Sequence, residues 1–335
     1  MVKHVIGRPC KVARRTDRAA VGRLADNLVL GVTLKRYKAS FDSFVKFYRP
    51  LRLEDSGSLA DRVDLSMVHD LEVLWQEGEG KTVAEYCYAS TLHFAPILKG
   101  KIPCALRLLN GWRRLELPAR AAPLSLDMLL CLCAVFLLWG FLDESLCLLI
   151  GFDLFLRTGE LTNLRRNSFT VSDTDDSAVI TLDDTKTVKK KIAACESLVI
   201  RDPFVLKAVR LLLRDDRQLL SGDRVMRLSP AQFNRVFVAA IKFLKWNDLG
   251  VKPYSVRRGG ATLHFRTHGN MASTILRGRW QSSRTARIYI EDGMATLAQL
   301  QLSMEQLNDV RSLRSHFISQ ICSGFARLGC VNESA

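Results

Sequence analysis

Tyr254-Ser-Val-Arg-Arg-Gly-Gly-Ala-Thr262 begins a basic stretch that continues through Gly278-Arg-Trp280 to Ser283-Arg-Thr-Ala-Arg-Ile-Tyr289. From residue 252 to residue 290 the chain has eight Lys or Arg residues and no Asp or Glu. Solvent-exposed helix faces usually carry charges of both signs. A pattern this one-sided instead predicts a pocket for a strongly anionic ligand, with a tyrosine at its edge.

The whole chain is also basic. It has 335 residues, with 49 Lys and Arg against 34 Asp and Glu, and a net charge of +15. This length is sufficient for two domains that each bury a core. The charge favours a polyanionic partner, either nucleic acid or an anionic membrane surface, although a basic protein without such a partner is the simpler alternative.

Cysteine usage and hydropathy limit the compartment. The nine cysteines form no Cys-x-x-Cys pair and have no His at metal-ligand spacing, which predicts a reduced intracellular protein, nuclear if its source is eukaryotic, without disulfides or a zinc site. The N-terminus lacks the apolar core of a signal peptide. The apolar run Met128–Leu142 is shorter than the roughly 20 residues of a membrane span, so we expect a buried helix and no membrane partner.

Composition divides the chain into four segments. Residues 1–116 contain four or five short helical patterns and no strand pattern, so we expect a helical domain. Residues 117–123 are a predicted linker because two prolines flank small residues. We expect residues 124–302 to form a second domain. Residues 303–335 are a predicted tail helix, whose apolar stripe from Leu307 to Phe325 is available to a neighbouring protomer.

The predicted strands are few and short. Phe169–Val171, Ala178–Leu182 and Ser197–Ile200 have strand composition and are separated by runs of Asp and Lys. Three antiparallel strands fit this spacing. The sequence therefore predicts a mainly α fold with a small antiparallel sheet (α+β).

Two helices of the first domain have testable details. Thr33–Arg49 predicts an amphipathic helix whose exposed face carries Lys35 and Lys38, which we assign to DNA binding. A second helix is expected over residues 64–76, with Asp64 as its N-cap.

Arg157-Thr-Gly-Glu160-Leu161 ends a predicted apolar helix that begins at Glu144. A guanidinium group at the end of a buried helix needs an anionic partner. That partner is either Glu160, three residues along the same helix, or a bound ligand, and the sequence leaves both open.

Arg257 and Arg258 lie at the start of a helix predicted over Tyr254–His268. The simple interpretation is a basic helix start followed by flexible glycines. The functional interpretation is that Arg257 faces the same anion as Arg157, because two planar guanidinium groups can clamp one phosphate. Adjacent helix residues diverge by about 100°, so Arg258 points elsewhere and is assigned to DNA binding.

Trp280 and Tyr289 lie nine residues apart in the basic stretch. Taken alone, they are as typical of a buried Trp and a core Tyr as of a site. Neighbouring cations, however, favour a phenolate over a phenol, which makes Tyr289 a candidate nucleophile. Other basic side chains of this segment are predicted DNA contacts: Arg279, Arg284 and Arg287.

Lys186 lies at the predicted tip between two strands, followed by Lys189, Lys190 and Lys191. The simple interpretation is a solvated hairpin. The functional interpretation is a lysine that acts as general acid toward a leaving 5′-oxygen, with Lys186 as the first choice and Lys189 as the second.

In order and spacing, these residues resemble the tyrosine recombinase (phage integrase) family. The elements are, along the chain, Arg157, Lys186, Arg257, Trp280 and Tyr289. The resemblance implies a two-domain clamp around double-stranded DNA, with a DNA-binding N-terminal domain and a catalytic C-terminal domain. It also implies a 3′-phosphotyrosyl intermediate, no metal or other cofactor, and a homo-oligomer on DNA.

Tyr254 departs from the family pattern, which most often has His or Lys at this position. A phenol can donate a hydrogen bond to a phosphate oxygen but is a poor base near neutral pH. Tyr254 is therefore included among the candidate catalytic residues with an altered role.

Three alternatives remain beside a recombinase. Tyr254 favours a DNA-binding protein of recombinase descent that no longer cuts. A type IB topoisomerase has the same chemistry, but the tail helix favours recombination because it could hold protomers together. A basic helical scaffold at a membrane or protein surface leaves the acid-free stretch unexplained.

Overall fold

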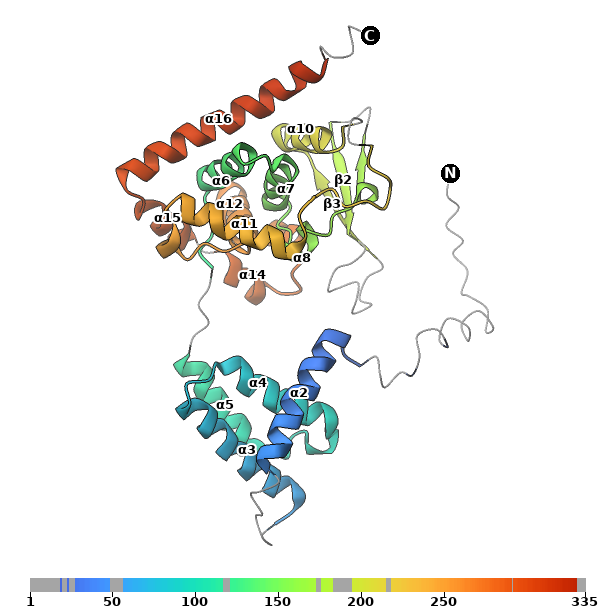
Figure 1. Ribbon diagram of the computed structural model, residues 1–335, viewed down its shortest axis with the longest axis vertical. Coiled ribbons are helices and arrows are strands. Elements are labelled where there is room, and N and C mark those ends of the chain that lie inside the picture. Colours follow the sequence, from blue (N-terminus) through green and yellow to red (C-terminus); the bar gives the residue numbers. More distant parts are fainter. Residues whose placement is uncertain are drawn as a thin grey trace. The chain divides into compact units, whose positions relative to one another are not determined.

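The computed structural model describes residues 28–48, 57–116, 121–172, 176–182, 195–214, 218–290 and 292–329, together with Ala19 and Arg23. The chain divides into two compact units (Figure 1). Unit 1 is residues 1–119 and unit 2 is residues 120–335. The boundary falls within the segment that the sequence indicates as a linker.

Unit 1 is helical in all its described elements. Phe44, Met67, Leu71, Leu109 and Trp112 are buried at its centre. The Trp75 ring also packs edge-on against Trp112, with the ring centroids 5.1 Å apart. The main helices are α2 (Gly31–Tyr48), α3 (Leu59–Gln76), α4 (Lys81–Phe94) and α5 (Pro103–Leu115).

The prediction that Asp64 caps the second helix is wrong. Ser58 is the N-cap of α3 and forms a capping box with Asp61. Asp64 lies inside α3, is buried, and accepts hydrogen bonds from the backbone N–H groups of Cys104 and Ala105 at 2.9 and 2.8 Å. Its carboxylate therefore satisfies the free N–H groups at the start of α5, a contact across about forty residues that local sequence does not reveal.

Unit 2 is built around α6 (Leu126–Leu138), which is buried along most of its length. Within the described residues, no helix is both long and apolar enough to cross a membrane. The helices before the sheet are α6, α7 (Leu142–Asp153) and α8 (Thr158–Leu161). Those after it are α10 (Pro203–Leu212), α11 (Pro230–Phe243), α12 (Ser255–His268), α13 (Met271–Gly278), α14 (Ser283–Tyr289), α15 (Asp292–Leu300) and α16 (Met304–Gly329).

The apolar helix predicted to run through Arg157 ends earlier. α7 stops at Asp153, and Phe155 then adopts a left-handed backbone with φ of 49°. Arg157 follows in an extended conformation as the N-cap of α8. The turn meets α12 at Gly260, where an added Cβ would lie 1.9 Å from the carbonyl oxygen of Phe152. Only glycine allows this close approach, which fixes α12 against the end of α7.

The predicted three-stranded antiparallel sheet is confirmed. β1 (Phe169–Val171), β2 (Ala178–Leu182) and β3 (Glu196–Ile200) pair in the order β1-β2-β3. Ile180 pairs with Phe169 on one side and with Leu198 on the other. These residues face the core, as the period of two requires. The mainly α fold class with a small sheet is therefore confirmed.

The tail helix α16 packs along α6 of its own unit (Figure 1). Val310, Phe317 and Ile321 of its apolar stripe are buried in the same core as α6. The reason for assigning this stripe to a neighbouring protomer therefore fails for these three residues, because the chain itself already covers them.

Candidate active site

Arg257 lies at the centre of the site. It is on the first turn of α12 and is 0% exposed. Its guanidinium donates hydrogen bonds to the carbonyl oxygen of Phe155 and, at 2.7 Å, to that of Gly278. The carbon between its terminal nitrogens lies 5.0 Å from the ring centroid of Trp280 and 5.3 Å from that of Tyr289, within cation–π range. The polypeptide thus holds this side chain with carbonyl dipoles and rings.

The Gly278-Arg279-Trp280 turn shapes the aromatic side of the site. Arg279 is left-handed, with φ of 56°, and ends α13. A Cβ at Gly278 would lie 2.1 Å from the Trp280 ring, so the ring lies flat on the glycine. The centroid of Trp280 is 4.7 Å from that of Tyr289 and 6.3 Å from that of Phe155. Glycine at position 278 is therefore needed for the tryptophan to reach the arginine.

A buried carboxylate forms the other side. Glu160 accepts hydrogen bonds from the backbone N–H of Arg157 at 2.8 Å and from its guanidinium at 2.5 Å. Its second strong partner is Arg279, at 2.7 Å, which also binds Glu196 at the start of β3 at 2.9 Å. Glu160 is thus the internal anionic partner of Arg157 that the sequence left open.

The charges of the site are unevenly compensated. Burial, followed by the positive charges of Arg157 and Arg279, lowers the pKa of Arg257 to about 10. Burial raises the pKa of Glu160, but Arg279 and Arg157 outweigh it, so the net direction is down. The centre around Arg257 therefore has an excess of positive charge, and a bound anion would stabilise its charged form.

Tyr254 and Tyr289 meet at the edge of this cationic centre. The hydroxyl of Tyr254 donates a hydrogen bond to the hydroxyl of Tyr289, and their ring centroids are 5.7 Å apart. Burial and this hydrogen bond raise the pKa of Tyr254, although Arg257 and Arg157 act in the opposite direction. Tyr254 is thus a neutral donor, and Tyr289 presents its oxygen beside two arginines.

No protein-family model and no curated protein sequence matches this chain. Among solved structures, the XerH site-specific recombinase bound to difH substrate in a pre-cleavage complex is similar, with a TM-score of 0.54 and 14% identity over 81% of this chain and 80% of that chain. A post-cleavage complex of XerH with a palindromic difH substrate gives a TM-score of 0.51 and 13% identity over 84% and 79%.

This chain has the fold of a tyrosine recombinase. Within this fold, the two arginines, the tryptophan and the tyrosine that the sequence pattern singles out come together in unit 2, although they span residues 157 to 289. Lys186 and Lys189, the predicted general acids, lie outside the described residues.

Two predicted DNA contacts in the basic stretch do not face solvent. Arg258 is 3% exposed and donates to the carbonyl oxygen of Ile288 at 2.9 Å. Arg279 is buried against Glu160 and Glu196. Both side chains bind within the chain, where they hold α14 and the active-site turn in place, and their contact with DNA stays a prediction.

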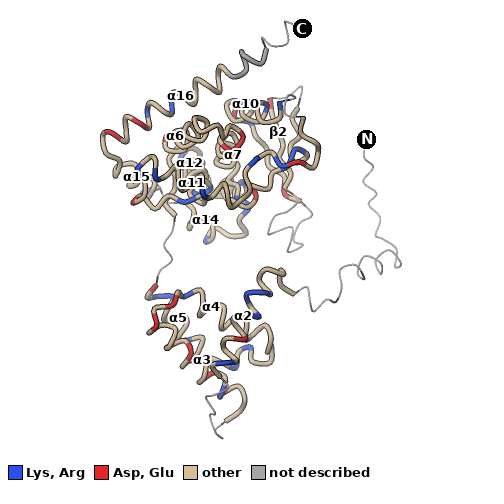
Figure 2. Tube along the Cα trace, viewed as in Figure 1, with Lys and Arg blue, Asp and Glu red and all other residues tan. Residues whose placement is uncertain are grey.

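The remaining predicted DNA contacts are exposed. Arg284 and Arg287 are exposed on α14, and Lys35 and Lys38 are exposed on α2 in unit 1. Figure 2 shows basic residues along α2. Their exposure is compatible with phosphate contacts.

Phe155, Glu196 and Gly278 are site residues that the sequence did not reveal. Phe155 contributes a backbone carbonyl, Glu196 starts a strand, and Gly278 provides space for a ring. The one available signal was the position of Gly278 directly before Arg279 and Trp280. The other two act through contacts more than eighty residues away in the chain.

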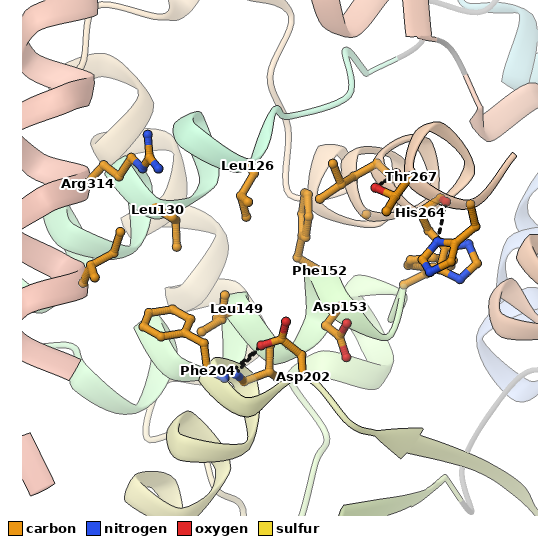
Figure 3. Close-up of a pocket in the computed structure, with 16 residues that line it drawn as sticks. Leu126, Leu130, Leu149, Phe152, Asp153, Asp202, Phe204, His264, Thr267 and Arg314 are labelled. Carbon is orange, nitrogen blue, oxygen red and sulfur yellow. Dashed lines mark hydrogen bonds between the residues drawn. The ribbon is translucent and has the colours of Figure 1, made fainter. Parts of the chain in front are cut away.

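A separate cavity of about 420 Å³ lies among α6, α7, α10, α12 and α16, with a mainly apolar wall that includes Leu149, Phe152 and Ile318 (Figure 3). Its polar groups already bind within the chain: Asp202 accepts from the backbone N–H of Phe204, and Asp153 pairs with Arg277 at 2.7 Å. Within the described residues, no group of three or more His, Cys, Asp or Glu side chains could hold a metal ion. The arginine centre is therefore the candidate active site.

Proposed function

We propose that this protein is a site-specific DNA recombinase or integrase that cuts and rejoins DNA through a covalent bond between Tyr289 and a 3′-phosphate. The observation that carries the proposal is the environment of Arg257: a buried guanidinium beside two other arginines, under the rings of Trp280 and Tyr289. A phosphate diester is an anion of the right size and charge for this centre. The fold of unit 2 supports the same reaction class.

Each side chain has a role in the proposed reaction. The Tyr289 oxygen attacks phosphorus, and Arg157 and Arg257 stabilise the charge that develops on the non-bridging oxygens. Within the described residues, the Nε of Arg257 and the Nε1 of Trp280 are buried donors without a hydrogen-bond acceptor. A phosphate oxygen can satisfy such donors. Lys186 is proposed as the general acid that protonates the leaving 5′-oxygen.

The two units divide the work of binding. We propose that residues 1–116 form a DNA-binding domain that contacts phosphates through Lys35 and Lys38, joined by residues 117–123 to a catalytic domain over residues 124–302. Arg284 and Arg287 add contacts beside the active site. Joining two duplexes requires more than one protomer, so we propose a homo-oligomer on DNA, with residues 303–335 as the segment to test for protomer contacts.

A covalent adduct on nicked duplex DNA is the direct test. A nick near the cleaved phosphate lets the freed 5′ end diffuse away, so the phosphotyrosyl product accumulates on a pool of nicked duplexes of varied sequence. We expect a denaturant-resistant protein–DNA adduct that forms in EDTA and maps to Tyr289. Tyr289→Phe keeps the ring on Trp280 and removes only the hydroxyl, so it should give no adduct.

A DNA-binding protein that no longer cuts is the second candidate, favoured by the hydrogen bond that engages the Tyr289 hydroxyl with Tyr254. Salt-sensitive DNA binding by the wild type without any adduct would support it. An adduct that persists in Tyr289→Phe would instead exclude Tyr289 as the nucleophile, and inhibition by the chelator would exclude the metal-free mechanism.

A further inference from the structure

The hydroxyl groups of Tyr254 and Tyr289 form one hydrogen-bonded pair, in which Tyr254 is the donor. Their positions are fixed by the packing of α12 against α14. Arg258 donates to the carbonyl oxygen of Ile288 at 2.9 Å, and Thr262 donates to the carbonyl oxygen of Tyr289 at 3.2 Å. Two residues of α12 thus hold the end of α14 in the position at which the Tyr289 hydroxyl contacts the Tyr254 hydroxyl.

We propose that Tyr254 is a hydrogen-bond donor to the reacting oxygen of Tyr289, and that it keeps its own proton while it stabilises the phenolate that attacks phosphorus. This inference rests on the function proposed above. It gives Tyr254 a role opposite to that of a general base, and directs its hydroxyl to the nucleophile rather than to the phosphate. A hydrogen bond from a neutral donor to an anion is about twice as strong as one between neutral groups.

The electrostatics of the pair support a donor. Burial and the contact with Tyr289 raise the pKa of Tyr254, so its neutral, proton-bearing form is favoured. A phenol that resists ionisation cannot remove a proton from its neighbour near neutral pH, but it can donate a hydrogen bond to the neighbouring oxygen. The charged groups at and around the pair are Arg157, Arg257, Arg279, Glu160 and Glu196.

The proposed step is balanced in atoms and protons. The phenolic proton of Tyr289 passes to water before the attack, and the hydrogen bond from Tyr254 remains. The Tyr289 oxygen then bonds to phosphorus as the bond from phosphorus to the 5′-oxygen breaks. The leaving 5′-oxygen takes up one proton, so there is no net change in protonation. Nothing is oxidised or reduced.

The test is the pH dependence of adduct formation by Tyr254→Phe under single-turnover conditions with saturating nicked duplex. We expect the rate at pH 7 to fall roughly 10- to 100-fold, because a hydrogen bond to a charged group is lost. We expect the pH at which the rate rises to move by about one to two units toward alkaline pH, because a tenfold change in an ionisation equilibrium corresponds to one pH unit. Tyr254→His, which retains a ring N–H, should restore part of the rate.

Tyr86→Phe is the matched control, because Tyr86 lies in unit 1, where its hydroxyl accepts from Arg36, and the substitution removes the same atom far from the site in sequence. Its pH profile should be that of the wild type. An unshifted profile for Tyr254→Phe, or a faster reaction, would overturn the donor role, and so would an adduct that maps to Tyr254. With either of the first two outcomes, loss of the adduct in Tyr289→Phe would still support the proposed function, whereas an adduct on Tyr254 would overturn Tyr289 as the nucleophile as well. If Tyr254→Phe unfolds, the pH profile of Tyr254→His decides. A wild-type dependence of rate on pH would support donation by the ring N–H. A rate that increases with pH as the imidazole loses its proton would show a base and overturn the proposal.

Discussion

Arg257 and Arg279 belong to the same acid-free stretch and both side chains are largely buried, yet their surroundings differ. Arg279 binds two carboxylates, Glu160 at 2.7 Å and Glu196 at 2.9 Å. Arg257 binds backbone carbonyls and lies against aromatic rings, and burial, followed by the positive charges of Arg157 and Arg279, lowers its pKa to about 10. The chain compensates Arg279 with carboxylates, and we propose that Arg257 binds an anion from outside.

One sequence pattern thus contains an arginine with a structural role, Arg279, and an arginine for which we propose a role in the reaction, Arg257. A buried ion pair mainly costs stability when it is broken, whereas a preorganised, uncompensated donor contributes when charge develops in a transition state. Two residues at the site have a left-handed backbone. Phe155 accepts a hydrogen bond from Arg257 with its carbonyl oxygen, and Arg279 ends α13 and reverses the chain. Such backbone strain is typical of functional sites.

The largest expected effect is on stability at the compensated arginine. Arg279→Ala leaves Glu160 and Glu196 buried with part of their charge unpaired, so the free energy of unfolding should fall by about 3–5 kcal/mol. Chemical denaturation of unit 2 measures this loss. Arg287→Ala removes an exposed arginine from the same stretch and should change stability by less than about 0.5 kcal/mol.

The pH dependence of stability checks the same ion pair. The pKa of Glu160 is lowered in the folded protein, so its contribution to stability is complete above its ordinary value of 4.5 and is lost as pH falls through the folded value. Glu160→Gln should therefore flatten that acidic part of the stability curve. Equal stability of Arg279→Ala and Arg287→Ala would show that the carboxylate side does not hold the site together.

The next effect concerns catalysis at Arg257. Lysine keeps the positive charge but cannot hold the Phe155 and Gly278 carbonyls and a phosphate with one planar group. Arg257→Lys should therefore reduce the cleavage rate by about 100- to 1000-fold, the cost of one preorganised donor. Affinity for non-specific duplex DNA should stay within about twofold of wild type, because one phosphate contact among many is a small part of binding.

Adduct formation on nicked duplex and DNA affinity are measured on the same preparation, with thermal unfolding as the check of folding. A parallel loss of affinity and cleavage in a folded Arg257→Lys protein would contradict the assignment. Arg257 would then be a general DNA contact or a structural residue like Arg279, and the contrast between the two arginines would disappear.

The sequence predicted the sheet and most helices because those patterns are local. Residues 169–171 and 178–182 alternate toward the core, and Ser229 precedes Pro230 in a capping box that marks the start of α11. It failed where a residue acts at a distance. Asp64 caps α5 across the chain, and α7 ends at Asp153 rather than at Arg157 because the Phe155 turn packs against α12.

The candidate site was predicted in the same uneven way. The order and spacing of the motifs selected Arg157, Arg257, Trp280 and Tyr289, and the fold brings these four residues to one centre. The pattern could not distinguish which arginines of the stretch face inward, because Arg258 and Arg279 find their partners in Ile288 and Glu160, which are 30 and 119 residues away in the chain. Charge along the sequence indicates an anionic ligand but does not say which cation binds it.

The smallest effect, and the sharpest division of the basic stretch, concerns its exposed arginines. Arg284 and Arg287 lie in solvent on α14, so Arg284→Ala and Arg287→Ala should each lower the slope of log affinity against log salt by about 0.9, the value for one lost phosphate contact. Arg279→Ala, in folded protein, should leave this slope unchanged, because its guanidinium is occupied by two carboxylates. Titrations of duplex DNA between low and moderate salt give all three slopes. An unchanged slope for both exposed variants would place the DNA away from α14, and a lower slope for Arg279→Ala would mean that this arginine leaves Glu160 and Glu196 when DNA binds.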